Sequence, residues 1–594
     1  MDKIKLFNEF INNLLTLFDN GSGIRTLTVY AHNLSGFDGI LLMKHLFSFG
    51  KVKPLLHNGK LISITLKLNI KGHKTKTIIF KDSILMLPLA LRELCNSFKV
   101  KASKGYFPFL LNDLTYNGEF PKFEFFNSIS LTEYLNFKKQ YSNKIWSFKD
   151  EAIKYCEMDC VALHQIISKF SVLIFKQFKV DPIKALTLPA LAMRIYKTHF
   201  MPENTIFQLH GQPQELIRKS YTGGAVDAYI PAFTQQTPED LLYSYDVNGL
   251  YPYVMANFDM PIGKPVPFLG DIRNIDPQAF GFFYCEITSP EFLEHPILQR
   301  RIKTVNGLRT IAGLGTWEGW IFSKEMDNAM KYGYQFNIIK GYEFEKADIF
   351  SDYVNKLYNL RLKYSKGDAM NLIAKLLLNS LYGKFGMKPE ITKVEILDNN
   401  PEIFNKYLDK INTNIIDIIH LDNKIVLIYN VNKFTPSDIN NVFHDDAFHA
   451  LDVNIAIASA ITAYARIKMS YFKNNPNFKL YNSDTDNIVI NKPLPSELVG
   501  KELGLMKLEH VIKKAVFLAP KVYGLIEDNG NEIIKAKGLT KDSIKSIKVS
   551  DLELLLVKDS TKQFTQTKGF KDLFAGNYTI SDMLYTLKAT SNKR

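Results

Sequence analysis

The most regular pattern of apolar and polar positions lies in the segment 371–382, where apolar residues recur with helical spacing. Lys375, Asn379 and Tyr382 fall at i, i+4 and i+7, so they share one face of the predicted helix. A lysine can hold a phosphate as a point charge. A polar stripe that is only solvated is the simpler interpretation. Two glycines are predicted to stop this helix: Gly383 and Gly386.

Two further patterns predict strands that end in acidic residues. The segment Lys479–Ile490 is typical of a strand, a tight turn and a second strand, with Asp484 and Asp486 at the turn. Such a turn presents two carboxylates where hard divalent cations can reach them. An apolar and aromatic run, 241–245, predicts a buried strand that ends at Asp246. Taken singly, an ordinary acidic turn and a strand cap explain these acids equally well.

The first third of the chain combines a predicted strand, Leu27–Tyr30, with a predicted helix, Ile40–Phe47. Tyr155 and Asp159 are four residues apart in a second helical pattern, so they share a face. In the C-terminal third, a run of small residues, Ala456–Tyr464, predicts another helix.

Composition suits a large globular protein with a nucleic-acid partner. The chain has 594 residues, 46% hydrophobic, and a formal net charge of +14. Phosphate neutralisation supplies most sequence-independent affinity for nucleic acids, although charge alone is weak evidence. No apolar run of membrane-spanning length is apparent, so no membrane is expected. Cys156 and Cys160 lie one turn apart without a second pair nearby, which favours reduced core thiols over a zinc site.

Five segments together resemble motifs of family B DNA polymerases, in the order of that family. They are Tyr221–Gly224 for the Y-x-G-G linker motif, Asp246–Pro252 for motif A, Lys375–Gly383 for motif B, Asp484–Asp486 for motif C and Lys521–Tyr523 for the K-x-Y motif. The combination is similar to the protein-primed branch, which small phages and linear mitochondrial plasmids carry. This order is very specific, whereas each segment alone is not.

The resemblance implies a nucleotidyl-transfer site with two Mg²⁺ ions, for which Mn²⁺ can substitute. Asp246, Asp486 and the backbone carbonyl of Val247 would hold the metal, and Asp484 would support the site. Tyr251 would lie under the incoming sugar and exclude a 2′-hydroxyl. The implied nucleotide-binding residues are Tyr251, Lys363, Lys375, Asn379 and Tyr382. The implied DNA-binding residues are Tyr221, Gly223, Gly224, Lys521, Tyr523 and Ser83.

Two positions depart from the family pattern. Gly249 stands in motif A where serine is usual, so a hydroxyl near the triphosphate is missing. Asn482 stands before motif C where an aromatic residue is usual. Neither change removes a metal ligand, but both could lower efficiency or alter metal preference.

A second site in the first third resembles part of a 3′–5′ exonuclease. Asn33, Phe37 and Asp38 match the motif N-x-x-x-F-D, and Tyr155 and Asp159 match Y-x-x-x-D. No D-x-E motif precedes Asn33. We therefore expect impaired proofreading, a domain shortened at its N-terminal side, and a remaining role as a single-strand clamp.

The resemblance implies an α/β and α+β multidomain fold: an RNase H-like exonuclease domain, then right-hand palm, fingers and thumb. The expected parts are an exonuclease-like domain at 1–190, palm at 191–262, an insertion at 263–345, fingers at 346–387, a second insertion at 388–450, palm at 451–535 and thumb at 536–594.

The leading hypothesis is a DNA-directed DNA polymerase that extends a 3′-hydroxyl with dNTPs on a primer-template. The resemblance adds replication of a linear plasmid-type element, a terminal protein as primer, a mitochondrial location and a monomer. The alternative is a non-catalytic DNA-binding relic of a plasmid polymerase, suggested by the absent motif, Gly249 and Asn482. A nuclease acting alone is disfavoured by the absence of D-x-E.

Overall fold

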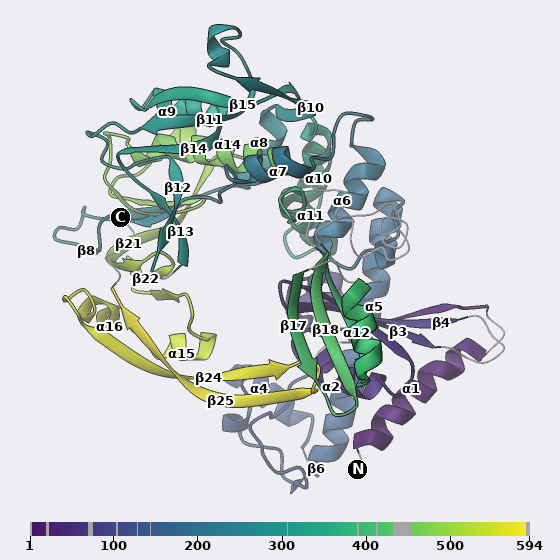
Figure 1. Ribbon diagram of the computed structural model, residues 1–594. Helices are drawn as coiled ribbons and strands as arrows, with labels where there is room; N and C mark the ends of the chain where they lie inside the picture. The colour runs from purple at the N-terminus through teal and green to yellow at the C-terminus, as the bar shows by residue number, and fades with distance from the viewer. Residues whose placement is uncertain are drawn as a thin grey trace.

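The computed structural model describes residues 3–19, 23–68, 75–102, 105–127, 129–142, 144–305, 307–388, 391–410, 414–431 and 454–589. The end of the predicted second insertion and the start of the returning palm, 432–453, lie outside the described residues. In Figure 1 the ribbon forms a ring, with the hairpin β24–β25 along its lower side.

An eight-stranded sheet, here called the central sheet, is built from segments far apart in the chain. Its order is β23-β22-β21-β9-β20-β19-β7, and β8 pairs with β21. The strands are β7 (Val226–Ala228), β8 (Ala232–Thr234), β9 (Leu242–Val247), β19 (Leu480–Asp484), β20 (Asn487–Ile490), β21 (Met506–Ala519), β22 (Val522–Glu527) and β23 (Glu532–Ala536). The predicted strand before Asp246 and the predicted strand–turn–strand at 479–490 are both confirmed.

Two helices cover the central sheet and complete the largest apolar core. They are α14 (Ile455–Lys473) and α8 (Leu250–Asn257). The small-residue run predicted as a helix forms the first half of α14, whose alanines let neighbouring elements approach closely. Burial of apolar surface on this scale supplies the main driving force for the fold.

A four-stranded sheet, β10-β15-β11-β14, packs beside this core. A two-stranded hairpin, β12–β13, extends from it, and α9 lies against it. The bounds are β10 (Met260–Leu269), β11 (Gly281–Thr288), β12 (Gln299–Thr304), β13 (Gly307–Ala312), β14 (Thr316–Phe322), α9 (Ser323–Met330) and β15 (Gln335–Ala347).

A helical layer contains α6 (Leu188–His199), α10 (Ser351–Lys363) and α11 (Ala369–Phe385). The predicted helix at 371–382 is confirmed as the centre of α11. The expected stop at Gly383 is wrong, because the helix continues to Phe385 and Gly386 forms its C-cap. A single glycine inside a helix costs only about 1 kcal/mol, which burial of this helix offsets.

The N-terminal region holds a four-stranded sheet of order β1-β4-β3-β2. The predicted strand and helix around Asn33 are confirmed as β1 and α2. The bounds are α1 (Lys3–Asp19), β1 (Thr26–Ala31), α2 (Asp38–Leu46), β2 (Lys51–His57), β3 (Lys60–Leu68), β4 (Lys76–Asp82), α3 (Leu91–Phe98), β5 (Asn117–Gly118), α4 (Leu131–Lys139), β6 (Trp146–Ser147) and α5 (Phe148–Phe178). Helix α7 (Gly211–Arg218) lies outside this region and packs against α14.

Helix α5 corrects two expectations. By length and composition it could cross a membrane, so the expectation that no segment reaches that size is wrong. One such helix is weak evidence of a span. Ala162, Ile166 and Phe170 of α5 pack in the main core, and 28% of its apolar window is buried. Its two cysteines, Cys156 and Cys160, are exposed rather than core thiols.

The remaining elements join the N-terminal sheet to the C-terminal end of the chain. Strand β16 packs against β2, and the turn of the β24–β25 hairpin inserts Phe574 into the same apolar core. Phe37 and Tyr578 stack edge to face beside it, with ring centroids 5.2 Å apart. The bounds are β16 (Ile391–Asp398), α12 (Pro401–Lys410), β17 (Asn414–His420), β18 (Lys424–Val431), α15 (Lys541–Lys545), α16 (Val549–Leu554), β24 (Thr561–Asp572) and β25 (Asn577–Lys588).

We expect Phe574→Ala to release the hairpin from the N-terminal region. Phe574 is 4% exposed, and truncating a buried Phe costs about 3 to 5 kcal/mol. Hydrogen exchange at the hairpin turn should therefore accelerate by about a hundredfold to a few thousandfold. Phe570→Ala, on the same hairpin but 48% exposed, is the matched control. Equal exchange in the two variants would contradict the docking.

Candidate active site

Asp246 lies near the end of β9, between two neighbouring strands of the central sheet. It faces Asn487 on β20 and Lys507 on β21. The next residue, Val247, donates its backbone N–H to the carbonyl oxygen of Asp486 at 2.9 Å. This hydrogen bond ties the end of β9 directly to the turn that carries the other predicted acids.

That turn, here called the catalytic turn, consists of Asp484, Thr485 and Asp486. Thr485 has φ +62°, a left-handed conformation that closes the two-residue connection between β19 and β20. Its backbone N–H donates to the carbonyl of Ala225 at 2.8 Å, and the N–H of Asp486 donates to the carbonyl of Asp484 at 2.7 Å. The turn is thus held between β9 on one side and β7 on the other.

Electrostatics show that the sheet brings the predicted acids together. Burial, then the charge of Asp486 and of a further carboxylate, Glu509, raises the pKa of Asp246 to about 7. Burial, with the charge of Asp484, also raises the pKa of Asp486. Carboxylates that repel one another in a partly buried site are suited to a cation, which relieves both costs. The residues present therefore fit a divalent metal.

The acids leave most of a metal's coordination positions open. Within the described ranges, no three His, Cys, Asp or Glu side chains are arranged to hold an ion on their own. An open site of this kind leaves room for oxygen atoms of a substrate.

Sequence reasoning missed two charged residues beside Asp246. Glu509 and Lys507 both act on its pKa, the carboxylate raising it and the ammonium lowering it. They lie on β21, where a register shift between Leu508 and His510 leaves Glu509 as an extra residue against β9. No local spacing signals this position, because the bulge is set by pairing between distant strands.

Lys521 holds the first acid of the catalytic turn. Its ammonium donates to both carboxylate oxygens of Asp484, at 2.7 and 2.9 Å. Tyr523, two residues later on β22, is half-buried, and burial together with the charges of Asp484 and Glu509 raises its pKa. The structure therefore places the predicted K-x-Y segment beside the predicted motif C.

Two tyrosines stack next to these acids. Tyr251 from α8 and Tyr382 from α11 have ring centroids 4.1 Å apart at an angle of 19°. Burial, and the neighbouring phenol, raises the pKa of Tyr251 far above its usual range. Gly249 precedes α8 with φ +58°, a left-handed conformation that favours glycine. Its Cβ would lie 2.9 Å from Leu503, so the local backbone explains the departure from serine.

The polar stripe of α11 is partly exposed. Lys375 and Asn379 lie on the accessible face, and the amide of Asn379 donates to the carbonyl of Lys375 at 3.1 Å. Lys363, the last residue of α10, is also exposed. Asn371 fixes the two helices together, because its amide donates to the carbonyls of Arg361 and Tyr364 at 2.8 Å each.

The predicted linker motif lies directly behind the catalytic turn. A Cβ on Gly224 would lie 2.5 Å from the Thr485 side chain, so only glycine fits there without a shift. The carbonyl of Tyr221 accepts a hydrogen bond from Arg301 at 2.6 Å, and that of Gly223 accepts one from Arg466 at 3.2 Å.

The exonuclease-like residues gather at a second place. Asp38 begins α2, and burial together with the charge of Asp82 raises its pKa. Burial, with smaller contributions from the charges of Cys156, Asp159 and Asp38, raises the pKa of the Cys160 thiol on α5. Asn33 adopts a left-handed φ of +72° in the turn after β1. Tyr155 lies among aromatic side chains, with its ring 5.5 Å from that of Phe107.

The expected DNA contact of Ser83 needs correction. Its side chain is fully buried, where the hydroxyl donates to the carbonyl of Ala31 at 3.1 Å and pairs with the ring of His32 at 2.9 Å. The serine therefore supports the turn after β1 from inside the fold. It does not offer a surface to a DNA strand in this conformation.

The structure thus brings together acids on a sheet, a helix with an exposed lysine and asparagine, and two stacked tyrosines. Residues 23–477 match the family described as DNA polymerase type B, organellar and viral. The chain belongs to this family.

Two fungal relatives are similar along almost the whole chain. A probable DNA polymerase of Ascobolus immersus is 36% identical over 586 residues, which are 95% of this chain and 46% of that protein. A probable DNA polymerase of Neurospora intermedia is 35% identical over 589 residues, 95% of this chain and 57% of that protein. The chain thus spans about half the length of these curated relatives.

A solved structure shares the fold. Phi29 DNA polymerase complexed with primer-template DNA matches with a TM-score of 0.63 and 19% sequence identity, covering 94% of this chain and 91% of that one. At this identity the match shows a mixed α/β multidomain fold and no more.

Because the acids lie close together, we expect the free energy of unfolding to fall as pH rises. The pKa of Asp246 is about 7 in the folded protein and 3.8 without its surroundings. The folded state therefore binds the proton more tightly, so this contribution is present below pH 4 and is lost as pH rises through 7.

Asp246→Asn should stabilise the metal-free protein at pH 8 by about 1 to 2 kcal/mol after allowance for solvent screening, and by almost nothing at pH 4. Calorimetry in a chelator measures both values, with Asp259→Asn, an exposed carboxylate, as the control. A variant less stable than the parent at pH 8 would show that the acids do not repel.

Proposed function

We propose that this chain is a DNA-directed DNA polymerase that adds dNTPs to the 3′-hydroxyl of a primer-template. The observation that carries the proposal is the convergence of Asp246, Asp484 and Asp486 at adjoining strand ends, where burial, together with the neighbouring carboxylates, raises the pKa of Asp246 to about 7. Its membership in the type B family and the fold shared with a polymerase bound to primer-template DNA support it.

In this proposal Asp246, Asp486 and the carbonyl of Val247 hold two Mg²⁺ ions. When bound, these ions lower the pKa of the primer hydroxyl and offset charge on the triphosphate. Lys375 and Lys363, exposed on neighbouring helices, bind the triphosphate. Asn379 and Tyr382 line the nascent base pair. Lys521 and Tyr523 hold the primer end, while Tyr221, Gly223 and Gly224 lie along the template.

Primer extension with Mg²⁺ and each dNTP tests the activity. We expect the parent chain to extend a primer and Asp486→Ala to be at least about a thousandfold slower, since removing a metal ligand forfeits several kcal/mol of transition-state stabilisation. Loss of extension must come with retained binding of primer-template, measured by fluorescence anisotropy. A parent chain that binds primer-template without extending it would favour a non-catalytic relic.

Tyr251 gives the proposal a separate test of sugar selection. The stack with Tyr382 holds the Tyr251 ring in a fixed position beside the acids. Tyr251→Val should raise ribonucleotide use relative to deoxynucleotide use by roughly tenfold or more, about 1.4 kcal/mol of discrimination. Competition between ATP and dATP opposite a template thymine measures this ratio. An unchanged ratio would place the sugar elsewhere.

We further propose that proofreading by this chain is weak and that the N-terminal region acts chiefly as a single-strand clamp. Asp38 and Asp159 converge, but Asp82 is engaged as a turn cap. Its two oxygens accept hydrogen bonds from Asn33, Ser35 and Ile84, so they support the backbone and are not free for a metal.

The family and the fungal relatives support further parts of the proposal. These are the replication of a linear plasmid-type element in mitochondria, a terminal protein as primer, a monomeric state, and the division into an exonuclease-like domain, palm, fingers, thumb and two insertions given above.

A further inference from the structure

The strand that supports the catalytic turn from behind is short and lies at a sheet edge. Strand β7 has three residues and is the last strand of the central sheet, next to β19. Asp227 faces Ser483, and Val226 faces Asp484, the first acid of the turn. A ladder of three residues at an edge has few hydrogen bonds of its own, so its position depends on contacts from outside the sheet.

Helix α14 supplies those contacts with two buried cations two turns apart. Arg466 pairs with Glu325 through two hydrogen bonds of 2.6 and 2.7 Å, and both side chains are buried. Its third nitrogen donates to the carbonyl of Thr222 at 2.7 Å and to that of Gly223 at 3.2 Å. Arg466 therefore fixes the chain just before β7.

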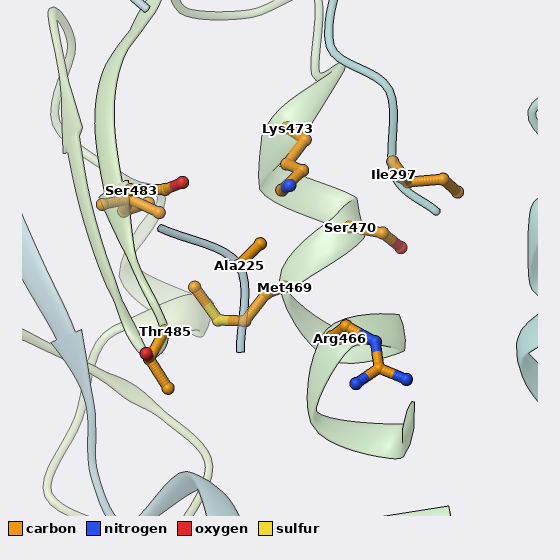
Figure 2. A pocket seen from close by; sticks show the side chains of 9 residues that line it. Ala225, Ile297, Arg466, Met469, Ser470, Lys473, Ser483 and Thr485 are labelled. Carbon is orange, nitrogen blue, oxygen red and sulfur yellow. The ribbon is translucent and has the colours of Figure 1, made fainter. Parts of the chain in front are cut away.

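The second cation, Lys473, faces β7 itself. Its side chain is 6% exposed, and its ammonium lies 3.7 Å from a carboxylate oxygen of Asp227. That separation exceeds a hydrogen bond, and among the described residues the ammonium has no hydrogen-bond partner. Figure 2 shows Lys473 and Arg466 on one helix, Ser483 and Thr485 on the neighbouring hairpin, and Ala225 between them.

These side chains border a cavity of about 20 Å³, which is room for one water molecule. The Lys473 nitrogen is itself buried, and Asp227 is the carboxylate that lies within 4 Å of it. Burying an ammonium away from water costs several kcal/mol unless an opposite charge offsets it. An apolar residue of the same size would avoid that cost, so packing alone does not explain why a lysine stands at this position.

Asp227 links this lysine to the catalytic turn. The phenol of Tyr229 lies 3.4 Å from a carboxylate oxygen of Asp227 and 3.4 Å from the hydroxyl of Ser483, the residue before Asp484. A shift of Asp227 would therefore move both the backbone ladder and this side-chain bridge. The ladder reaches Asp484 through Val226, and the bridge reaches Ser483, the residue before Asp484.

We propose that Lys473 and Asp227 form a positioning pair that sets the catalytic turn for metal binding. The inference rests on the proposed function, because it assigns the turn a metal. In this inference both residues act through β7. If the pair acts in this way, loss of either residue weakens the affinity for metal, while the protein remains folded and still binds DNA.

Mn²⁺ binding by electron paramagnetic resonance, on the full chain with primer-template, tests the pair without requiring turnover. Lys473→Met and Asp227→Asn, which preserve size, should each raise the dissociation constant for Mn²⁺ about fivefold or more. The double variant should be no worse than the worse single one, because both remove the same interaction. Lys468→Met, a half-buried lysine of the same helix over the ring of Tyr253, should bind as the parent does.

Thermal unfolding of each variant separates positioning from stability, since a structural role alone lowers the melting temperature without changing the Mn²⁺ constant of the folded protein. If Lys473→Met does not fold, the Mn²⁺ dissociation constant of Asp227→Asn tests the pair by itself. Parent-like Mn²⁺ binding in the single variants, or independent additive effects, would overturn the pair. Asp486→Ala is the reference for lost binding: if it and the parent bind Mn²⁺ equally poorly, the proposed metal site fails together with this inference.

Discussion

The functional centre depends on forcing like charges together. Asp246, Asp484 and Asp486 repel one another, and the sheet nevertheless holds them at adjoining strand ends. The chain can do this because β9 pairs with both β20 and β21, and because helices α8 and α14 bury an extensive apolar core beside them. Hydrophobic burial elsewhere thus offsets an arrangement that is unfavourable by itself.

Contacts between segments far apart in the chain also hold other parts of the molecule together. The central sheet joins strands from the middle of the chain to strands near its end, and Phe574 joins the C-terminal hairpin to the N-terminal core. In Figure 1 these connections close the ribbon into a ring. Elements that form the site are therefore fixed relative to elements that lie far from it in sequence.

Sequence patterns could predict the positions that local interactions decide, but not those that depend on contacts between distant segments of the chain. Asp484 and Asp486, or Lys375, Asn379 and Tyr382, are placed by local spacing, which strand and helix periods convert into geometry. Glu509 was missed because a bulge between distant strands decides its position.

Burial was misjudged for the same reason. Ser83 turned out to be buried and Cys156 exposed, since local patterns do not tell which face a neighbouring element will cover. Arg466 left a weak signal, because it is the first charge after a long stretch of small and apolar residues, but its partner Glu325 is visible only in three dimensions.

The bond between Lys521 and Asp484 gives the centre an internal counter-ion. One ammonium cannot remain bidentate on this carboxylate and also grip a primer phosphate at full strength, so the two anions compete for it. If Lys521 holds the primer end as proposed, a primer that draws it away leaves one more unneutralised carboxylate beside Asp246 and Asp486, which raises the affinity of the turn for a cation. By linkage, a cation that neutralises the turn would free Lys521 for the primer to the same extent. On that proposal, occupancy by nucleic acid and occupancy by metal are coupled, and neither has to come first.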